Sequence, residues 1–226
     1  MTPALWNAAW LTLQLAAIST LILLLLGAPL AWWLSRTGTR AKPLIEALIA
    51  LPLVLPPTVI GFYLLLAFAP HSALGQFWLG ATGSPLAFSF SALVIGSVIY
   101  SLPFVVQPLQ ATFSAIPDSL LEAAGTLGAS RQDRLRSIIL PLSRRGLVAA
   151  ASLGFAHTVG EFGIVLMIGG NIPGQTQVLS IALYDQVEML NYPAAHRIAL
   201  VLAAVALLML ALVYSSQHSA RKRGLP

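Results

Sequence analysis

The chain has 226 residues, of which 58% are hydrophobic and only 8% are charged, so it is far more apolar than a soluble domain and is expected to be an all-α integral membrane protein. Because it contains no cysteine, a disulfide framework, a thiolate metal site and a cysteine nucleophile are excluded. Its formal net charge of +5 comes from short basic clusters at the ends of apolar runs, a distribution typical of membrane orientation and not of a nucleic-acid-binding surface.

The first membrane span is expected at about residues 8–34. Its core, residues 11–34, is apolar apart from small polar side chains. At about 1.5 Å per residue this core measures roughly 36 Å, which is enough to cross the hydrocarbon layer. No Lys or Arg precedes it, and it is longer than the apolar core of a cleavable signal peptide, so we expect it to remain in the mature protein.

The second span, at about residues 44–69, contains Pro52, Pro56 and Pro57. Proline lacks the backbone N–H that a helix needs, so we expect a kinked or broken backbone there. Inside a membrane, broken backbone is tolerated where it is buried in protein or lines a wet cavity. These prolines are therefore candidates for the translocation path, and a plain kink that shapes helix packing is the alternative.

The rest of the chain alternates between spans and connections. Residues 70–85 carry no Lys or Arg and are expected to form an outer loop near the membrane surface, with Trp78 as an anchor. Residues 178–190, with Asp185 and Glu188, are too short and too charged to cross, so an amphipathic or re-entrant helix at the outer face is expected. The remaining spans are expected at about residues 87–107, 146–168 and 194–216.

The positions of the basic residues predict the orientation. Eleven of the twelve Lys and Arg residues, all except Arg197, lie in segments 36–42 and 131–145 or at the C-terminus. Cytoplasmic segments are enriched in these residues, so five spans place the N-terminus outside and the C-terminus in the cytoplasm. We find no internal repeat and no linker, and residues 1–226 are expected to form a single transmembrane domain.

One polar stretch, residues 117–141, separates the third span from the fourth. Ser119 and Glu122 have the spacing of a capping box, which predicts a helix from Leu120. Gly128 suits a left-handed residue after that helix, and Ser130 with Asp133 repeats the start signal. The stretch therefore predicts two short helices joined at a glycine.

Apolar residues give each of these two helices a face. Leu120, Ala124 and Leu127 form a ridge on the first, able to dock in a groove of another protein. The second helix is expected to place Leu135, Ile138 and Ile139 on one side and to be interrupted at Pro141. From the capping pattern alone, an ordinary amphipathic connector between two spans remains the alternative.

His157 and Glu161 are the unusual polar pair of the fourth span. Four residues apart, they are expected on one face of a helix. Ionisable residues at that depth are costly unless paired or wet, so the pair is a candidate for the translocation path. Gly154, Gly160 and Gly163 would let another helix approach closely, and a polar clamp at a helix contact is the alternative.

The polar stretch resembles a known family. Glu122-Ala123-Ala124, three residues, Gly128, nine residues, Ile138, one residue and Leu140-Pro141 is similar to the conserved loop of permease subunits of bacterial ABC importers. The resemblance implies a helix that plugs into a separate ATP-hydrolysing subunit. It assigns ATPase coupling to the following residues: Leu120, Glu122, Ala123, Ala124, Leu127, Gly128, Leu140 and Pro141.

Other segments resemble the permease subunit of molybdate importers and, similarly, of sulfate permeases: Leu51 to Pro57, Gly160-Glu161-Phe162-Gly163 and Asn171-Ile172-Pro173-Gly174. The resemblance implies a type I ABC importer permease fold in the bacterial inner membrane. It implies a homodimer with two ATPase subunits, which bind ATP and magnesium, and a periplasmic oxyanion-binding protein. Molybdate or tungstate is the expected cargo, and sulfate or thiosulfate is the close alternative.

The sequence also indicates that this chain is not the ATP-hydrolysing subunit. It has no phosphate-binding Gly-x-x-x-x-Gly-Lys-Ser/Thr loop, and its only lysines are Lys42 and Lys222, so ATP hydrolysis is expected on another chain. We expect no catalytic residue, cofactor or metal here. An intramembrane hydrolase using Ser152 and His157 would lack a Gly-x-Ser-x-Gly elbow. A passive channel or secondary transporter would need no coupling loop.

Overall fold

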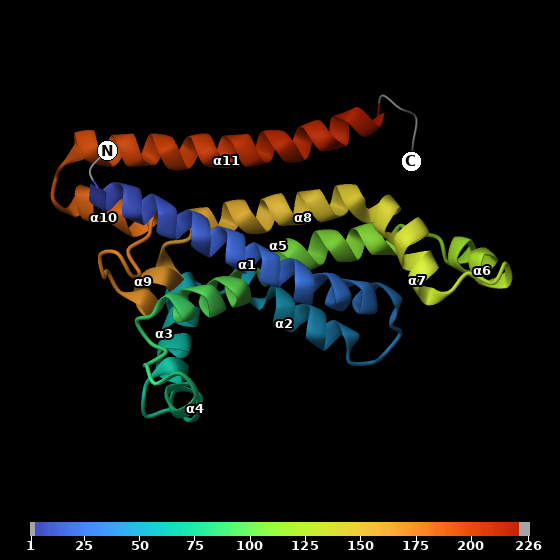
Figure 1. Ribbon diagram of the computed structural model, residues 1–226, viewed down its shortest axis with the longest axis horizontal. Coiled ribbons are helices and arrows are strands. Elements are labelled where there is room, and N and C mark those ends of the chain that lie inside the picture. The colour runs from blue at the N-terminus through green and yellow to red at the C-terminus, as the bar shows by residue number, and fades with distance from the viewer. Residues whose placement is uncertain (1–2, 222–226) are drawn as a thin grey trace.

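The computed structural model describes residues 3–221, and the regular elements in that range are all helices. Four long helices run side by side along the molecule (Figure 1). They are α1 (Pro3–Arg36), α5 (Phe90–Ser114), α8 (Leu140–Gly160) and α11 (Tyr192–Arg221). Four helical segments are long and apolar enough to cross a membrane, and a bent helix pair brings the number of spans to as many as five. The predicted all-helical fold with about five spans is confirmed.

The bent pair is the second span. Helix α2 (Lys42–Val54) and helix α3 (Pro57–Phe68) meet at an angle of 110°. Between them Leu55 is extended, and Pro56 and Pro57 cannot donate to the preceding turn. Pro52 lies within α2 and is buried. The predicted break is confirmed, at Pro56 and Pro57 and not at Pro52.

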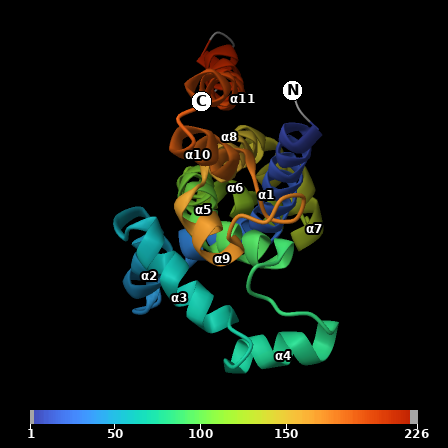
Figure 2. The same ribbon diagram turned by 90° about the vertical axis from the view of Figure 1, so that its left-hand side faces the viewer.

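The stretch expected as an outer loop, residues 70–85, contains a ten-residue helix, α4 (Ala73–Thr82). The Ser72 hydroxyl accepts a hydrogen bond from the Gly75 N–H at 2.9 Å and caps its start, and left-handed Gly83 ends it. The prediction of a loop was wrong because these small polar residues cap a helix here and do not replace it. Figure 2 shows α3 and α4 extending from one flank of the bundle, with α11 on the opposite flank.

Two spans differ in length from the prediction. Helix α5 continues to Ser114 with Pro103 and Pro108 inside it, well beyond the expected end at residue 107. The fourth span was expected to run unbroken to residue 168, but α8 ends at Gly160 and a separate helix, α9 (Gly163–Gly169), follows. The segment after α9 leads to α10 (Leu179–Glu188), the short helix expected before the last span.

The core forms where α1 packs against α5 and α8. Leu23, Val105 and Leu109 are fully buried in one apolar cluster at this contact. A second cluster, around Leu93 and Ile164, joins α5 to α9. One end of the bundle is thus held by contacts among the long helices α1, α5 and α8, and the other by contacts of α5 with the short helix α9 of a broken span.

The basic clusters gather at one end of the bundle. Figure 1 places the end of α1, helices α6 (Asp118–Thr126) and α7 (Arg131–Arg134), and the end of α11 together, opposite the N-terminus and α10. Lys222 and Arg223, which belong to the basic cluster at the C-terminus, lie outside the described residues. The arrangement brings two predicted cytoplasmic segments, 36–42 and 131–145, to the same side, as the charge distribution requires.

Candidate functional site

Helices α6 and α7 project beyond the ends of the long helices (Figure 1). No residue of α6 is buried, and Leu127, directly after it, is 88% exposed. Leu120 in the same helix is 43% exposed, so two leucines of the hairpin face outward. The projecting hairpin therefore presents a free apolar surface, formed by Leu120 and Leu127 with Ala124 between them.

The start of α6 differs from the prediction. The helix begins at Asp118 directly after Pro117, and no side chain caps it. The Ser119–Glu122 capping box was therefore wrong: Ser119 already lies within the first turn, where its hydroxyl cannot act as the cap. The second box is confirmed. Ser130 Oγ accepts from the Asp133 N–H at 3.2 Å, and Asp133 Oδ2 accepts from the Ser130 N–H at 3.1 Å.

Gly128 joins the two helices in the left-handed conformation, with φ of 83°, as predicted. The N–H of Ala129 donates to the Ala124 carbonyl at 2.9 Å, which closes the end of α6 in the manner of a Schellman motif. A Cβ at this position would meet nothing within 4 Å. The requirement for glycine is thus conformational and not one of space.

Pro141 does not interrupt the second helix. Residues Leu135–Ile139 form one turn of π-helix, η1, and the Leu140 N–H donates to the Leu135 carbonyl, five residues back. The wider turn accepts a proline at the next position, so α7, η1 and α8 continue as one helical segment from Arg131 to Gly160. The predicted end at Pro141 was wrong, and Leu140 lies half exposed beside the hairpin.

Arg36 ties the hairpin to the bundle. Its Nη2 donates to the carbonyls of Phe113 at 3.0 Å and Ile116 at 2.9 Å, and its Nη1 pairs with the Asp118 carboxylate. The guanidinium also lies 4.9 Å from the centre of the Trp32 ring. One side chain from α1 thus closes the end of α5 and holds the first residue of α6. Sequence reasoning missed this role because a basic residue after a span is already explained by orientation.

His157 and Glu161 do not form a pair. Helix α8 ends at Gly160, and Glu161 has the extended backbone angles φ −69° and ψ 132°, so the two side chains do not share a helix face. His157 Nδ1 lies 2.9 Å from Ser101 Oγ of α5, and its ring stacks on Phe104 with 3.9 Å between the ring centres. The expectation of one helical face was wrong, although His157 does form a polar contact between two helices.

Glu161 instead holds the turn between α8 and α9. Its Oε1 accepts from the Ile164 N–H at 2.9 Å, and its carbonyl accepts from Ser180 Oγ of α10 at 2.5 Å. The residue is only 7% exposed. A carboxylate at the start of a helix satisfies N–H groups that have no partner within it. Glu161 therefore joins three helices at the break in the fourth span.

The two broken spans meet at their breaks. A Cβ built on Gly163 would lie 2.7 Å from Pro57 Cβ, and one on Gly61 would lie 2.8 Å from Met167 Cβ, so α3 and α9 are in backbone-close contact. The structure thus brings Pro56, Pro57 and Glu161 to one region. His157 lies one turn before the break and faces α5.

No group of three or more His, Cys, Asp or Glu residues that could hold a metal ion occurs within residues 3–221.

Residues 23–222 match the family model of the binding-protein-dependent transport system inner membrane component. The chain belongs to this family. It is therefore a multi-pass inner-membrane permease subunit of an ABC transporter, not an enzyme, and the predicted family and location are confirmed.

Relatives of this permease share most of its length. It is 51% identical to the molybdenum transport system permease protein ModB of Azotobacter vinelandii over 208 residues, 92% of both chains. It is 32% identical to ModB of Escherichia coli K12, covering 83% and 82%. It is 33% identical to the sulfate transport system permease protein CysT of Salmonella typhimurium, covering 92% of this chain and 75% of the other.

Solved structures support the permease fold. A crystal structure of a bacterial ABC transporter that imports alginate matches with a TM-score of 0.72 at 16% identity, covering 98% of this chain and 80% of that one. An inward-facing MetNI methionine ABC transporter matches with a TM-score of 0.71 at 18% identity, covering 98% and 99%. The expected type I ABC importer permease fold is confirmed.

Proposed function

We propose that this chain is the permease subunit of an ATP-driven molybdate importer that also accepts tungstate. The main support for molybdate as the cargo is the 51% identity, over 92% of both chains, to a protein named as a molybdenum transport system permease. In this proposal the chain works as a homodimer in the inner membrane. Its partners are two ATPase subunits, which bind ATP and magnesium, and a periplasmic oxyanion-binding protein; no nucleic acid is involved.

The projecting hairpin is the proposed contact with the ATPase. Leu120, Ala124 and Leu127 supply an exposed apolar ridge, and Glu122 and Ala123 lie on the exposed part of the same helix. Gly128 sets the angle between the two short helices. An apolar helix face of this kind fits a groove on another protein.

The neighbouring turn would connect the docked hairpin to the membrane. Leu140 and Pro141 lie where η1 passes into α8, so the helix that follows the hairpin is itself a membrane span. Arg36 links the first residue of α6 to α1. Movement of the ATPase would thus reach two spans, through a continuous helix and through the contacts of Arg36 with Asp118 and with the end of α5.

The proposed translocation path runs near the meeting point of the two broken spans, between two copies of the chain. Broken backbone at Pro56, Pro57 and Glu161 supplies polar groups at membrane depth, while Pro52 and His157 border the region. The chain carries no Lys or Arg from residue 43 to residue 130 or from residue 146 to residue 196, so both broken spans lack a fixed cation near their breaks. A dianion would therefore meet weak donors and no deep electrostatic trap.

Sulfate is the second candidate cargo. The 33% identity to a sulfate permease covers 92% of this chain, so the same scaffold serves a chemically similar oxyanion in a relative. The two cargoes differ little in charge and shape. With no fixed cation along the proposed path, selection is expected on the binding protein and not on the permease.

Reconstitution tests the proposal. The permease, its ATPase and the binding protein are placed in proteoliposomes, and ATP hydrolysis and anion uptake are measured together. Molybdate- or tungstate-loaded binding protein is expected to stimulate hydrolysis, whereas free molybdate is not, since the loaded protein must favour the ATP-competent state. Stimulation only by sulfate-loaded protein would reassign the cargo. Stimulation by free molybdate alone would contradict the coupling mechanism.

A further inference from the structure

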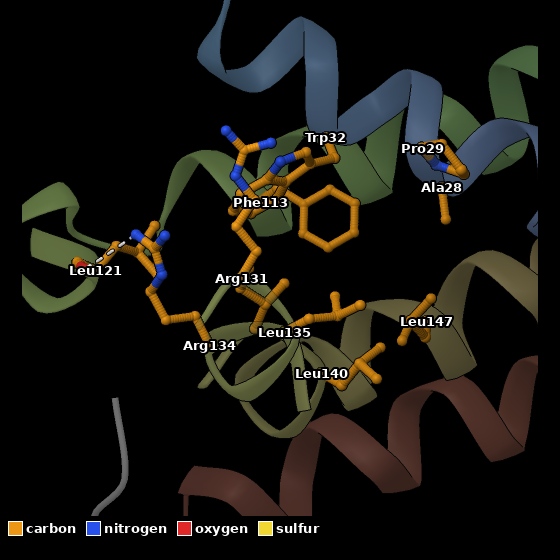
Figure 3. Close-up of a pocket in the computed structure, with 11 residues that line it drawn as sticks. Ala28, Pro29, Trp32, Phe113, Leu121, Arg131, Arg134, Leu135, Leu140 and Leu147 are labelled. Atoms are coloured by element: carbon orange, nitrogen blue, oxygen red, sulfur yellow. Dashed lines mark hydrogen bonds between the residues drawn. The ribbon is translucent and has the colours of Figure 1, made fainter. Parts of the chain in front are cut away.

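A cavity of about 510 Å³ lies between α1, the end of α5 and the segment from α7 to α8 (Figure 3). Nine of its eleven lining residues are apolar, among them Ala28, Trp32 and Leu147. The other two are Arg131 and Arg134. A largely apolar cavity with only cationic polar groups calls for a ligand that is itself divided into an anionic and an apolar part.

The two arginines lie at the same end of the cavity. Figure 3 shows the Arg131 guanidinium next to Trp32 and Phe113, and the Arg134 guanidinium next to Leu121, to whose carbonyl it donates at 3.5 Å. Arg134 Nε is buried without a hydrogen-bond partner. Neither arginine takes part in an ion pair within the part of the chain that the structure describes. Their positive charge is thus free to bind an anion.

The nearest acidic side chain in sequence is already engaged. Asp133 accepts hydrogen bonds from both the hydroxyl and the N–H of Ser130. These bonds hold the pKa of the Asp133 carboxyl below its ordinary value. Asp118 is paired with Arg36. Two of the three acidic groups of the hairpin thus have other partners, and the third, Glu122, forms no ion pair in the described part of the chain and does not line the cavity.

The apolar end of the cavity reaches into the membrane. Ala28 lies eight residues before Arg36, and Leu147 thirteen residues after Arg134, which corresponds to roughly 12 and 20 Å of helix. The arginines are at the end of the bundle where the spans begin, and Trp32 is an aromatic of the kind that lies at headgroup level. The cavity thus runs from the level of the headgroups to that of the acyl chains.

We propose that this cavity binds an anionic phospholipid of the cytoplasmic leaflet, with its phosphate between Arg131 and Arg134 and an acyl chain along Ala28 and Leu147. The leaflet rests on the proposed topology, in which α6 and α7 face the cytoplasm. A bound lipid would fill the space between the hairpin and α1. It would thereby stiffen the same junction that Arg36 closes on its other side.

Native mass spectrometry of the purified, delipidated full-length chain tests the site, with phosphatidylglycerol and phosphatidylcholine as probes. The wild type is expected to bind one phosphatidylglycerol at least about five-fold more tightly than phosphatidylcholine. Arg131→Gln and Arg134→Gln should each weaken phosphatidylglycerol binding about five-fold. Arg144→Gln, an equal charge change at an exposed position outside the cavity, should leave it unchanged. The assay needs no transport, so it stands apart from the choice of cargo.

A second variant tests the apolar end. Ala28→Phe places a ring in the cavity and should lower the binding of both lipids while the chain stays monodisperse.

Equal loss of phosphatidylglycerol binding in Arg144→Gln, or unchanged lipid binding in all cavity variants, would overturn the site. Displacement of the lipid by millimolar phosphate would assign the arginines to a soluble anion instead. Loss of the lipid on addition of the ATPase would assign the cavity to that subunit.

Discussion

Arg36 pairs with Asp118 although the two residues are 82 positions apart in the chain. The Arg36 side chain is only 22% exposed, so its hydrogen bonds to the Phe113 and Ile116 carbonyls are partly shielded from water. Asp118 itself is largely exposed, so the ion pair alone contributes little. The hydrogen bonds of Arg36 to the two carbonyls at the end of α5 are therefore its main contribution to holding the hairpin in place.

Replacing this arginine should weaken the fastening. Arg36→Leu leaves two buried carbonyls without their charged donor, and hydrogen bonds to charged groups contribute roughly 1.5–3 kcal/mol each. We expect a lower thermal unfolding temperature of the purified chain and a large loss of ATP-driven uptake. Arg40→Leu, which changes the charge equally in the exposed loop that follows, serves as the control. Identical melting of the two variants would contradict the assignment.

Gly128 offers a test of the hairpin angle. Gly128→Val puts a β-branched residue at φ of 83°, which costs roughly 1–2 kcal/mol in backbone strain and changes the direction of α7. Uptake should fall strongly while membrane insertion stays normal. Gly38→Val is the matched control, because Gly38 also has open space around it but no positive φ. Full transport by the Gly128 variant would count against coupling through this hairpin.

The contact between the broken spans can be tested with two neighbouring glycines. Gly163→Ala forces a methyl group to within 2.7 Å of Pro57, and overpacking of this kind costs about 1–3 kcal/mol. Gly160→Ala meets nothing within 4 Å and should be tolerated. Thermal unfolding of both variants gives the comparison. Equal stability would mean that α3 and α9 do not pack as closely as described.

Asp133 provides a test by titration. The two hydrogen bonds from Ser130 lower the pKa of its carboxyl, so the capping box stabilises the hairpin above the ordinary aspartate pKa and is lost as the pH falls through the lowered value. In Ser130→Ala the Asp133 pKa should move back up towards its ordinary range. The chain has only three aspartates, so carbon-13 NMR of aspartate-labelled protein can follow the shift. An unchanged titration would argue against the box.

The proposed orientation can be checked with single cysteines, since the chain has none of its own. Gly80→Cys in α4 and Gly38→Cys in the loop after α1 both add a side chain into open space. An impermeant thiol reagent should label the first from outside the cell and the second only after the membrane is opened. The reverse pattern would invert every side assigned to the loops.

The positions of the spans and the break at Pro56 and Pro57 could be predicted because they depend on local chemistry: apolar length, and a residue without an N–H. The left-handed Gly128 is of the same kind. Glu161 could not be predicted as a cap, since its spacing from His157 fits an α-helix equally well. Its carbonyl also accepts a hydrogen bond from Ser180 of α10, a distant contact that no local pattern records.

The identity of the family was available from motif spacing, while the role of Arg36 was not. Its partners are carbonyls and a carboxylate from a distant part of the chain, brought near only when α1 packs along α5. Pro141 was misjudged for a related reason. Its effect on the helix depends on the turn before it, which is a π-turn here and not an α-turn.

That wider turn, η1, has a consequence for how the hairpin is joined to the membrane. A π-turn holds one residue more than the α-helical pattern, and each α-helical residue advances by about 100° around the axis. A helical wheel drawn from Arg131 to Gly160 therefore assigns wrong neighbours to one half. Arg134, before the wide turn, contacts Leu121 of α6, and Leu147, after it, packs against the apolar cluster of α1 and α5. Both residues belong to one continuous helical segment, so a displacement of α7 would pass directly to the fourth span.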